Sequence, residues 1–350
     1  MLTPRLTLVR QLGIGEVRAS IMLGVGILGA GFFGAYHARA IAAAEGVRLV
    51  AACADELALA ESFTAEHGGK PYGDWRAMLD DRSVDAVAIT APHHLHCQLA
   101  VAALEAGKHV LLEKPMALSV AECNRIIASA QAGRAKLMVG QIMHFVWPYL
   151  VAREILDRGD LGKPITGSSR LLKTWMESNR RGWHLDPATG GGMLMTAGIH
   201  ALDQLIWLMD SRVSSVSAAV SISFHDQKAD DSAMMLLRFA DGRFGQVASI
   251  GFRDGGGAFD MDLVCENGTL RIDPDRGVAI GRGGQWSDVG NSRDPQWMQN
   301  AVIREWQAMA VAIENDAEVP VAGDYGRHII ACIEAAMISA REQRDVNVEA

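Results

Sequence analysis

Short apolar runs alternate with longer helical stretches from Met22 to about residue 142. The runs LGVGIL, VRLVAAC, VDAVAIT and HVLLE are apolar and rich in β-branched residues, and LHCQLAVAALEAG between the last two has helical character. Apolar runs separated by helical stretches are typical of βαβ units. The pattern therefore predicts a doubly wound parallel sheet with right-handed crossovers.

The pattern changes in the second half of the chain. Apolar and polar positions alternate in residues 232–252 and 259–273, around the turn pairs Asp241-Gly242 and Asn267-Gly268. Asp-Gly and Asn-Gly pairs are favoured in tight hairpins, so both stretches predict antiparallel strands. The segment QIMHFVWPY interrupts the earlier alternation, and its Pro148 suits the start of a helix.

We therefore expect two domains and a leading extension. Residues 22–142 are predicted to form a nucleotide-binding domain, and residues 143–350 an α+β substrate-binding and oligomerisation domain. Residues 1–21 precede the first pattern and form the extension. They do not resemble a signal peptide, because Arg5, Arg10 and Arg18 break up their apolar stretch.

Composition narrows the class of protein. The chain has 350 residues, of which 49% are hydrophobic and 21% charged, and it lacks the run of eighteen or more apolar residues that a bilayer span requires. Its net charge of −8 is spread along the chain without a basic cluster, which argues against nucleic acid as a partner. The odd number and wide spacing of the cysteines suit buried thiols in a reducing, cytoplasmic compartment. They are Cys53, Cys97, Cys123, Cys265 and Cys332.

A glycine fingerprint follows the first apolar run. In Gly29-x-Gly31-x-x-Gly34 the first glycine permits a tight turn, the second lets a pyrophosphate approach the backbone, and the third lets helix and strand pack closely. An acid that binds the adenosine ribose is expected about twenty residues later. Asp55 lies at about this distance, at the end of VRLVAACAD, and no arginine lies nearby to bind a 2′-phosphate, so NAD(H) is slightly favoured over NADP(H).

The chain resembles the family of glucose–fructose oxidoreductase, inositol dehydrogenase and the rhizopine-catabolism dehydrogenases. The resemblance rests on GILGAGFFGAYHARAI, on Glu113-Lys114-Pro115 preceded by AGKHVLL, on the downstream Gly-x-His-x-x-Asp that begins at Gly198, and on the late stretch GRHIIACIEAAMISAREQRDVNV. It implies a Rossmann domain followed by an α+β domain with a large, mostly antiparallel open sheet. It also implies a homo-dimer or homo-tetramer formed through that sheet.

Lys114 and His200 are the candidate catalytic residues. A hydride leaves a carbinol carbon only when the hydroxyl proton leaves too, so the site needs a base and a group that stabilises the developing oxyanion. Lys114 follows a predicted parallel strand, at the edge where doubly wound sheets bind ligands. The resemblance gives Lys114 a catalytic role and aligns His200 with the family's catalytic histidine. Without the resemblance, the default interpretation of a lone lysine is a surface residue, and that of a lone histidine on an apolar helix is a core residue.

The cofactor is expected to contact the glycine turn and the ends of the following strands. The expected residues are Gly29, Gly31, Phe32, Phe33, Gly34, Asp55, Ala91, Pro92, His96, Glu113, Lys114 and Pro115. The three histidines of APHHLHC also invite a metal interpretation. Their spacing is poor for a strand-to-helix turn and no carboxylate or cysteine partner is evident, so no metal is expected.

The stretch GGGMLMTAGIHALDQL is expected to bind substrate. It predicts an apolar helix with Thr196, His200 and Asp203 on one face, towards the cofactor, and with glycines that let a loop pass close to the substrate. Most relatives have an aspartate where this chain has Thr196, which puts sugar and polyol specificity in doubt and leaves cyclic diols open. Asp203 is placed to orient the His200 imidazole or to act as a structural partner. Arg181 and Trp183, in the loop before the glycines, either select an acidic or ring-shaped substrate or belong to a solvated loop.

These features predict an NAD(P)-dependent dehydrogenase or reductase. Its substrate would be a small molecule, a secondary alcohol or ketone of a sugar, polyol or cyclic diol. One alternative is a cofactor-binding regulator without turnover, against which the retention of both Lys114 and His200 argues. Another is an NAD-dependent glycosidase of the same fold, which would not release NADH.

Overall fold

The computed structural model describes residues 22–349, which divide into two compact units. The first runs through Ile142 and includes Met298–Arg327, and the second comprises Met143–Trp297 and the chain from His328 onward. The sequence predicts a second domain that is continuous from residue 143, whereas residues 298–327 return to the first unit. Helical periodicity shows that a helix has a buried face but not which core that face joins. The predicted extension, residues 1–21, lies outside the described residues.

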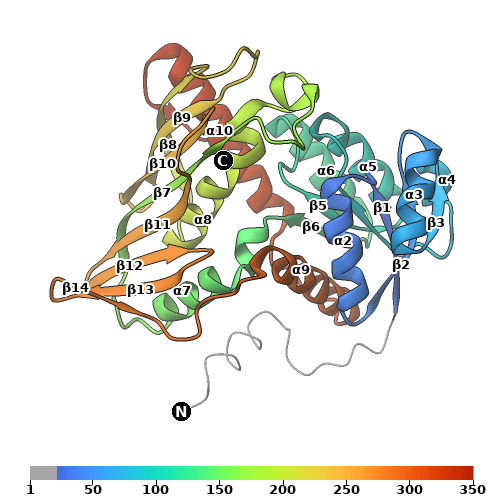
Figure 1. The fold of residues 1–350 in the computed structure, drawn as a ribbon, viewed down its shortest axis with the longest axis horizontal. Coiled ribbons are helices and arrows are strands. Elements are labelled where there is room, and N and C mark those ends of the chain that lie inside the picture. Colours follow the sequence, from blue (N-terminus) through green and yellow to red (C-terminus); the bar gives the residue numbers. More distant parts are fainter. Residues whose placement is uncertain (1–21, 350) are drawn as a thin grey trace. The chain divides into compact units, whose positions relative to one another are not determined.

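The first unit is built on a six-stranded parallel sheet (Figure 1). Its strands are β1 (Leu23–Leu28), β2 (Val47–Cys53), β3 (Lys70–Tyr72), β4 (Ala86–Ile89), β5 (His109–Glu113) and β6 (Leu137–Gly140). Their order is β3-β2-β1-β4-β5-β6, and every neighbouring pair is parallel. The strand order reverses between β1 and β4, and this is the switch point where doubly wound sheets bind ligands.

Helices cover this sheet, and one of them comes from the distant C-terminal segment. The helices are α2 (Phe32–Ala43), α3 (Leu57–His67), α4 (Trp75–Leu79), α5 (His96–Glu105), α6 (Val120–Ala132) and, from Met298 onward, α9 (Trp297–Glu314). Helix α9 packs against α2, where the Gln299 side-chain amide donates to the Tyr36 carbonyl and accepts from Arg39 Nε. Trp306 of α9 is fully buried in the same unit.

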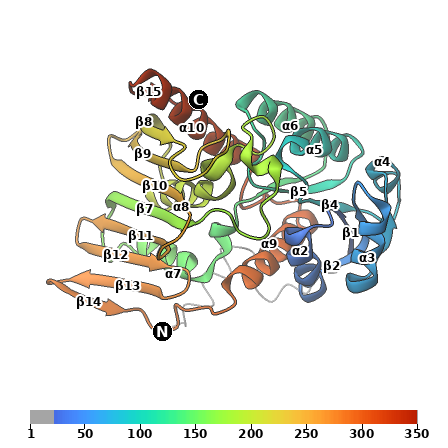
Figure 2. The same ribbon diagram turned by 45° about the horizontal axis from the view of Figure 1, so that its top comes forward.

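The second unit is built on a nine-stranded sheet (Figure 2). Its strands are β7 (Pro164–Thr174), β8 (Val213–Ser221), β9 (Ser232–Phe239), β10 (Phe244–Phe252), β11 (Ala258–Cys265), β12 (Gly268–Asp273), β13 (Gly277–Arg282), β14 (Gln285–Asp288) and β15 (Val346–Asn347). Their order is β14-β13-β12-β11-β7-β10-β9-β8-β15, and within it only β7 and β10 pair in parallel. The two predicted hairpins are confirmed as β9–β10 and β11–β12.

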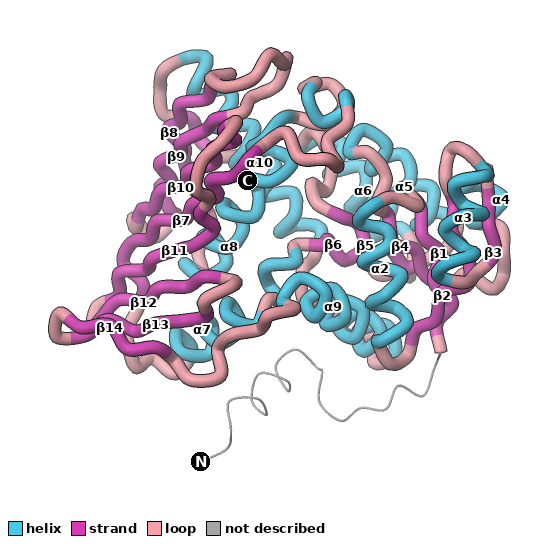
Figure 3. The backbone as a smooth tube through the Cα atoms, in the orientation of Figure 1, coloured by secondary structure: helices cyan, strands magenta, loops and turns pink. Residues whose placement is uncertain are grey.

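Helices pack on one face of the nine-stranded sheet and leave the other open. Helix α7 (Trp147–Asp157) packs on β12 and β13, and α8 (Ile199–Met209) packs on β7, β10 and β11 (Figure 3). Along β9, Met235, Leu237 and Phe239 are buried, whereas Met234 and Leu236 are exposed. The last helix, α10 (Gly323–Glu342), begins in the first unit and ends in the second.

The described residues hold no helix that combines the length and apolar character of a bilayer span. All five cysteines are buried as free thiols, as the sequence predicts.

A π-helical turn, Leu194–Gly198, leads into α8, and Asp230 holds its start. Asp230 Oδ2 accepts a hydrogen bond from the Leu194 amide at 2.8 Å, and its carbonyl accepts one from the Met193 amide at 2.9 Å. Burial raises the pKa of this carboxyl group from its ordinary value near 3.8 to about 7, against the opposing effect of the Leu194 amide. The buried carboxyl group therefore gains charge near neutral pH at a cost in stability.

We expect Asp230→Asn to stabilise the protein increasingly as the pH rises. Between about pH 4 and pH 7 the folded protein binds a proton on Asp230 that the unfolded chain has released, so the contribution of Asp230 to stability falls as the pH rises through this range. Asparagine resembles the protonated form at every pH. Melting temperatures should therefore be similar near pH 5, and the variant should melt a few degrees higher near pH 8.

Asp231→Asn is the matched control. Burial raises the pKa of Asp231, but hydrogen bonds from the Ser223 and Phe224 amides outweigh burial and lower the pKa below its ordinary value. Asp231 is thus ionised throughout this range, and its replacement should destabilise the protein by an amount that does not change with pH. A pH-independent difference for Asp230→Asn would show that its carboxyl group does not titrate near neutrality.

Candidate functional site

The turn between β1 and α2 is shaped by its three glycines in different ways. Gly29 has φ +116°, and a Cβ added there would lie 2.7 Å from the Thr90 carbonyl carbon. A Cβ added to Gly34 would overlap the Gly29 carbonyl oxygen. A Cβ added to Gly31, in contrast, would meet no atom of the described chain within 4 Å. The fold itself thus requires Gly29 and Gly34, whereas Gly31 leaves an open cradle that fits a pyrophosphate.

Helix α2 presents its N-terminus at this cradle. Gly31 is its exposed N-cap, and no side chain of the described residues caps the helix there. Phe32 is 61% exposed, and the Phe33 ring stacks on Tyr36 at 5.6 Å. The N–H groups of a helix's first turn lack intrahelical acceptors, and the helix dipole adds positive potential there. This end of α2 is therefore suited to an anion.

Asp55 lies in the loop that follows β2. The preceding Ala54 is held by a hydrogen bond from its amide to the Tyr72 carbonyl at 3.2 Å. Asp55 itself is exposed, and one of its carboxylate oxygens accepts a hydrogen bond from the Glu56 amide at 3.0 Å. The acid thus lies at the carboxyl end of β2, next to the strand that carries the glycine turn.

Lys114 follows β5 at the same edge of the sheet. Because β1, β4 and β5 are parallel neighbours, their carboxyl ends bring together the glycine turn, residues 90–92 and Lys114. Thr90 Oγ donates to the Gly29 carbonyl at 2.7 Å, which joins the ends of β1 and β4. Lys114 is half-buried, its peptide bond to Pro115 is cis, and its amide donates to Glu113 Oε2 at 3.2 Å.

His96, the first residue of α5, joins the loops after β4 and β5. Its Nδ1 lies 2.7 Å from the Pro115 carbonyl oxygen, and its Nε2 lies 2.9 Å from the Ala91 carbonyl oxygen. Burial lowers the pKa of His96, and the two carbonyl contacts oppose that effect. Both ring nitrogens face backbone oxygens, so this histidine acts as a bridge between two loops and presents no nitrogen to a metal.

Thr196 and His200 lie on the two sides of a helix junction. Thr196 is buried in the π-helical turn, and His200 is half-buried in the first turn of α8, its ring 6.4 Å from that of Phe259. The sequence predicts one continuous α-helix with a shared polar face. The wider π-helical turn, which bonds residue i to i+5, changes the register between these two residues, and such turns are frequent at functional sites.

Asp203 forms a hydrogen bond with His144, a residue that the sequence analysis does not predict as part of the site. Its Oδ1 lies 3.0 Å from His144 Nε2, and the His144 ring stacks on Trp207 with the centroids 4.2 Å apart. Asp203 is fully buried and His144 nearly so. This hydrogen bond makes Asp203 a structural partner of His144, and its expected roles towards His200 and the substrate stay predictions.

The glycine loop before the π-helical turn packs against the protein itself. A Cβ on Gly190 would overlap the Trp183 carbonyl oxygen, and Gly192, at φ +78°, leaves only 2.5 Å between an added Cβ and Asp230 Oδ1. These two glycines thus let the chain's own loops pack closely, and the expectation that they bring a loop close to the substrate stays a prediction. Arg181 is exposed, and its Nη1 donates to the Ser178 and Arg180 carbonyls. The Trp183 ring stacks on His184 at 3.6 Å.

Three residues of this region escape the sequence analysis. Thr90 ends an apolar strand, and His144 is an ionisable residue among the apolar residues that follow Gln141, and both positions are signals of a polar role. Asp230 lies in a polar stretch just before the alternating run that begins at Ser232, and it carries no such signal.

Two family models match the chain. "Oxidoreductase family, NAD-binding Rossmann fold" matches residues 23–141, and "GFO/IDH/MocA C-terminal domain" matches residues 149–271. Inositol 2-dehydrogenase 1 of Saccharopolyspora erythraea is 31% identical over 254 residues, which cover 71% of this chain and 73% of that protein. A 1-carboxy-3-chloro-3,4-dihydroxycyclo hexa-1,5-diene dehydrogenase of Comamonas testosteroni is 31% identical over 207 residues, which cover 59% of this chain and 52% of that protein.

A solved structure shares the fold. Levoglucosan dehydrogenase in complex with NADH and levoglucosan superposes with a TM-score of 0.84 over 94% of this chain and 100% of that one, at 23% identity. The parallel sheet, the large open sheet and the resemblance in sequence are thereby confirmed. The chain belongs to the oxidoreductase family with an NAD-binding Rossmann fold and a GFO/IDH/MocA C-terminal domain.

Proposed function

We propose that this oxidoreductase transfers a hydride between a nicotinamide cofactor and a secondary alcohol, or its ketone, on a hydroxylated ring. The observation that carries the proposal is the position of Lys114, which follows β5 at the edge where the glycine turn ends β1. The relatives named above dehydrogenate inositol and a dihydroxylated cyclohexadiene, both of which are rings that bear hydroxyl groups.

The open cradle at Gly31 supports dinucleotide binding. Gly29, Gly31, Gly34 and the amides of Phe32 and Phe33 would hold the pyrophosphate at the N-terminus of α2. Asp55 would accept hydrogen bonds from the adenosine ribose. Residues 54–61 carry three acids and no lysine or arginine, so a 2′-phosphate would face negative charge, and we propose NAD(H) as the preferred cofactor.

The loops after β4 and β5 would frame the reactive end of the cofactor. Ala91, Pro92, His96, Glu113 and Pro115 would form that frame. The nicotinamide, when bound, supplies the hydride acceptor or donor. Lys114 would hold or move the proton of the reacting hydroxyl at Nζ.

His200 is the second proposed acid–base group, and Thr196 is proposed to bond a substrate hydroxyl. Threonine offers a hydroxyl donor and acceptor without charge. A substrate that relies on a charged partner at this position would bind less well than a neutral diol. Asp203 would support this helix through His144, and Arg181 and Trp183 remain proposed contacts for the ring of the substrate.

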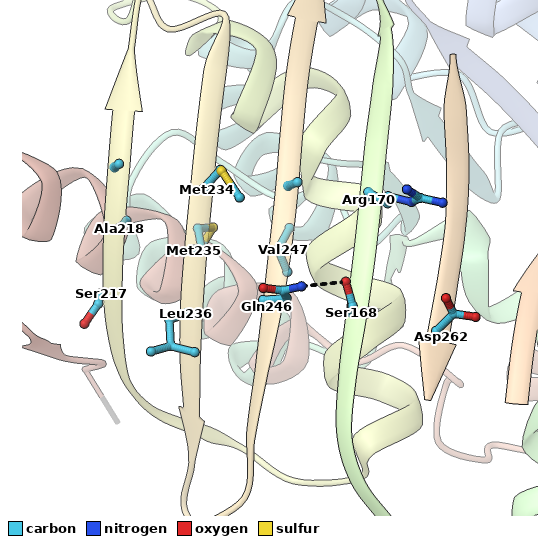
Figure 4. A pocket seen from close by; sticks show the side chains of 12 residues that line it. Ser168, Arg170, Ser217, Ala218, Met234, Met235, Leu236, Gln246, Val247 and Asp262 are labelled. Atoms are coloured by element: carbon cyan, nitrogen blue, oxygen red, sulfur yellow. Dashed lines mark hydrogen bonds between the residues drawn. The ribbon is translucent and has the colours of Figure 1, made fainter. Parts of the chain in front are cut away.

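The exposed face of the nine-stranded sheet supports self-association. A shallow hollow on this face combines apolar side chains with a hydrogen bond from Gln246 Nε2 to Ser168 Oγ at 3.0 Å (Figure 4). Met234 is 57% exposed and Leu236 37% on this face. Exposed apolar patches of this kind mark interfaces, and we propose that a second copy of the chain covers it in a homo-dimer or homo-tetramer.

The proposed activity is tested by assaying myo-inositol, levoglucosan and cyclic cis-diols for reduction of NAD⁺ and NADP⁺. We expect NADH to accumulate with at least one of these rings, and to exceed NADPH. Lys114→Ala should lower kcat about a hundredfold or more while the Kd for NADH changes little, because one positioned proton-transfer group is lost.

Lys108→Ala is the control for Lys114→Ala. Lys108 precedes the same strand at its other end, where Nζ donates to the Asp81 and Val84 carbonyls. Its loss should lower stability and leave kcat near the wild-type value. Equal turnover of Lys114→Ala and wild type would assign Lys114 a structural role, and cofactor recycling without net NADH would favour a glycosidase.

Gly31→Ala should weaken NADH binding about tenfold or more without loss of folding. The new methyl group meets no atom of the described chain, so it would occupy only the space proposed for the pyrophosphate. Calorimetric titration with NADH measures the effect. Gly290→Ala, at another exposed glycine with open space around it, should leave binding unchanged. Unaltered affinity in Gly31→Ala would place the dinucleotide elsewhere.

Leu236→Asp should reduce the mass of the assembly measured by light scattering after gel filtration. A charge in the centre of an apolar interface loses its hydration and finds no partner there. Met337→Asp, at a residue of similar exposure in α10, should keep the wild-type mass. An unchanged mass for Leu236→Asp, or a monomeric wild type, would contradict assembly through this face.

A further inference from the structure

Three buried side chains of the first unit form a hydrogen-bonded chain that ends at Lys114. Trp306 Nε1 of α9 donates to His37 Nδ1 of α2 at 3.0 Å. His37 Nε2 lies 3.0 Å from Glu113 Oε1, and Glu113 Oε2 accepts from the Lys114 amide at 3.2 Å. Trp306 and His37 are fully buried, and Glu113 is 5% exposed.

The chemistry of the three groups fixes the direction of each hydrogen bond. An indole nitrogen can only donate, so His37 Nδ1 must be the acceptor and carries no proton. The single ring proton then lies on Nε2 and is donated to the Glu113 carboxylate. A second proton on Nδ1 would set two N–H groups against each other. Trp306 therefore selects one neutral tautomer of His37.

Glu113 is also confined from the side of β6. A Cβ added to Gly140 would lie 2.9 Å from Glu113 Oε1, so this glycine leaves room for the carboxylate and for little else. A buried carboxylate that loses a donor pays a large desolvation cost, and rotation towards another donor relieves that cost. Such a rotation would remove the acceptor of the Lys114 amide.

We propose that Trp306 and His37 are positioning residues for Lys114. Trp306 fixes the His37 tautomer, His37 holds the Glu113 carboxylate, and Glu113 orients the backbone where Lys114 leaves β5. His96 holds the next carbonyl, that of Pro115, so the turn that carries Lys114 is fixed on both sides. The inference rests on the proposed function, because it assumes that the Lys114 amine acts on the substrate.

The direct test is Trp306→Phe, which keeps an aromatic ring and removes the indole N–H. With NAD⁺ and the ring substrate that wild type oxidises, we expect kcat to fall about tenfold, because small displacements of a reacting group are costly. KM and the Kd for NADH should change less than about threefold. Trp175→Phe is the matched control, since Trp175 is equally buried and donates to Gln227 Oε1 at 2.8 Å in the other unit.

A double-mutant cycle separates positioning from general destabilisation. If Trp306 acts through His37, adding Trp306→Phe to His37→Gln should cost almost no further kcat, because the first substitution has already broken the relay. Independent, multiplying losses would overturn the proposal. So would a kcat in Trp306→Phe that matches the Trp175→Phe control.

Two measurements need no substrate and keep this inference separate from the proposed function. Nitrogen-15 spectra of histidine-labelled protein, with His37 assigned by its loss in His37→Gln, should show the Nε2–H tautomer in wild type and a mixture in Trp306→Phe. Hydrogen exchange of the Lys114 amide should accelerate about tenfold in Trp306→Phe and not in Trp175→Phe. An Nδ1–H tautomer or unaltered exchange overturns the positioning, whereas a wild type without turnover overturns only the proposed activity.

Discussion

The parallel pairing of β1 with β4 and of β4 with β5 is the constraint on which the candidate site depends. Parallel neighbours end at the same edge, so Gly29, Thr90 and Lys114 meet there although more than eighty residues of sequence separate the first from the last. The strands themselves are almost wholly buried and apolar, so polar side chains can reach a ligand only at the strand ends. The hydrogen bond from Thr90 to Gly29 closes this edge and leaves Gly31 as the open position.

The sequence pattern predicts those elements of this protein that depend on interactions between residues close in sequence. Buried strands, glycine turns and two hairpins follow from periodicity and from backbone preferences. The same pattern places Lys114 after a strand, whereas its proposed role comes from the resemblance to the family. The π-helical turn before His200 does not, because the partner of its first amide is Asp230, thirty-six residues away in sequence. The packing partners of Gly190 and Gly192 do not follow from local pattern either, because Trp183 and Asp230 lie in other segments of the chain.

The buried histidines show why residue type alone does not identify a role. His96 bridges two carbonyl groups, His144 pairs with Asp203, and His37 is held between an indole and a carboxylate. Each would be costly to bury alone, and each is matched by partners from a different element. Networks of this kind fix a single arrangement of the elements that they join, because a buried network with unpaired polar groups destabilises the fold more than an apolar contact would. In this protein two of the three networks converge on the turn that carries Lys114.

The His37 network explains why residues 298–327 pack in the first unit although they follow the second-unit strands β7–β14 in sequence. Helix α2 follows directly after the glycine turn, and its buried face carries His37. The Nδ1 atom of His37 needs an uncharged hydrogen-bond donor from a neighbouring element. A tryptophan meets that need, because its indole supplies one donor and no acceptor and fills space with an apolar ring. The βα units up to Ile142 place Glu113 on one side of His37, and α9 supplies the donor on the other. Without α9, His37 Nδ1 would lose this donor, so the proposed orientation of the Lys114 turn depends on a helix that lies between β14 and β15 in the chain, far from the βα units that it joins.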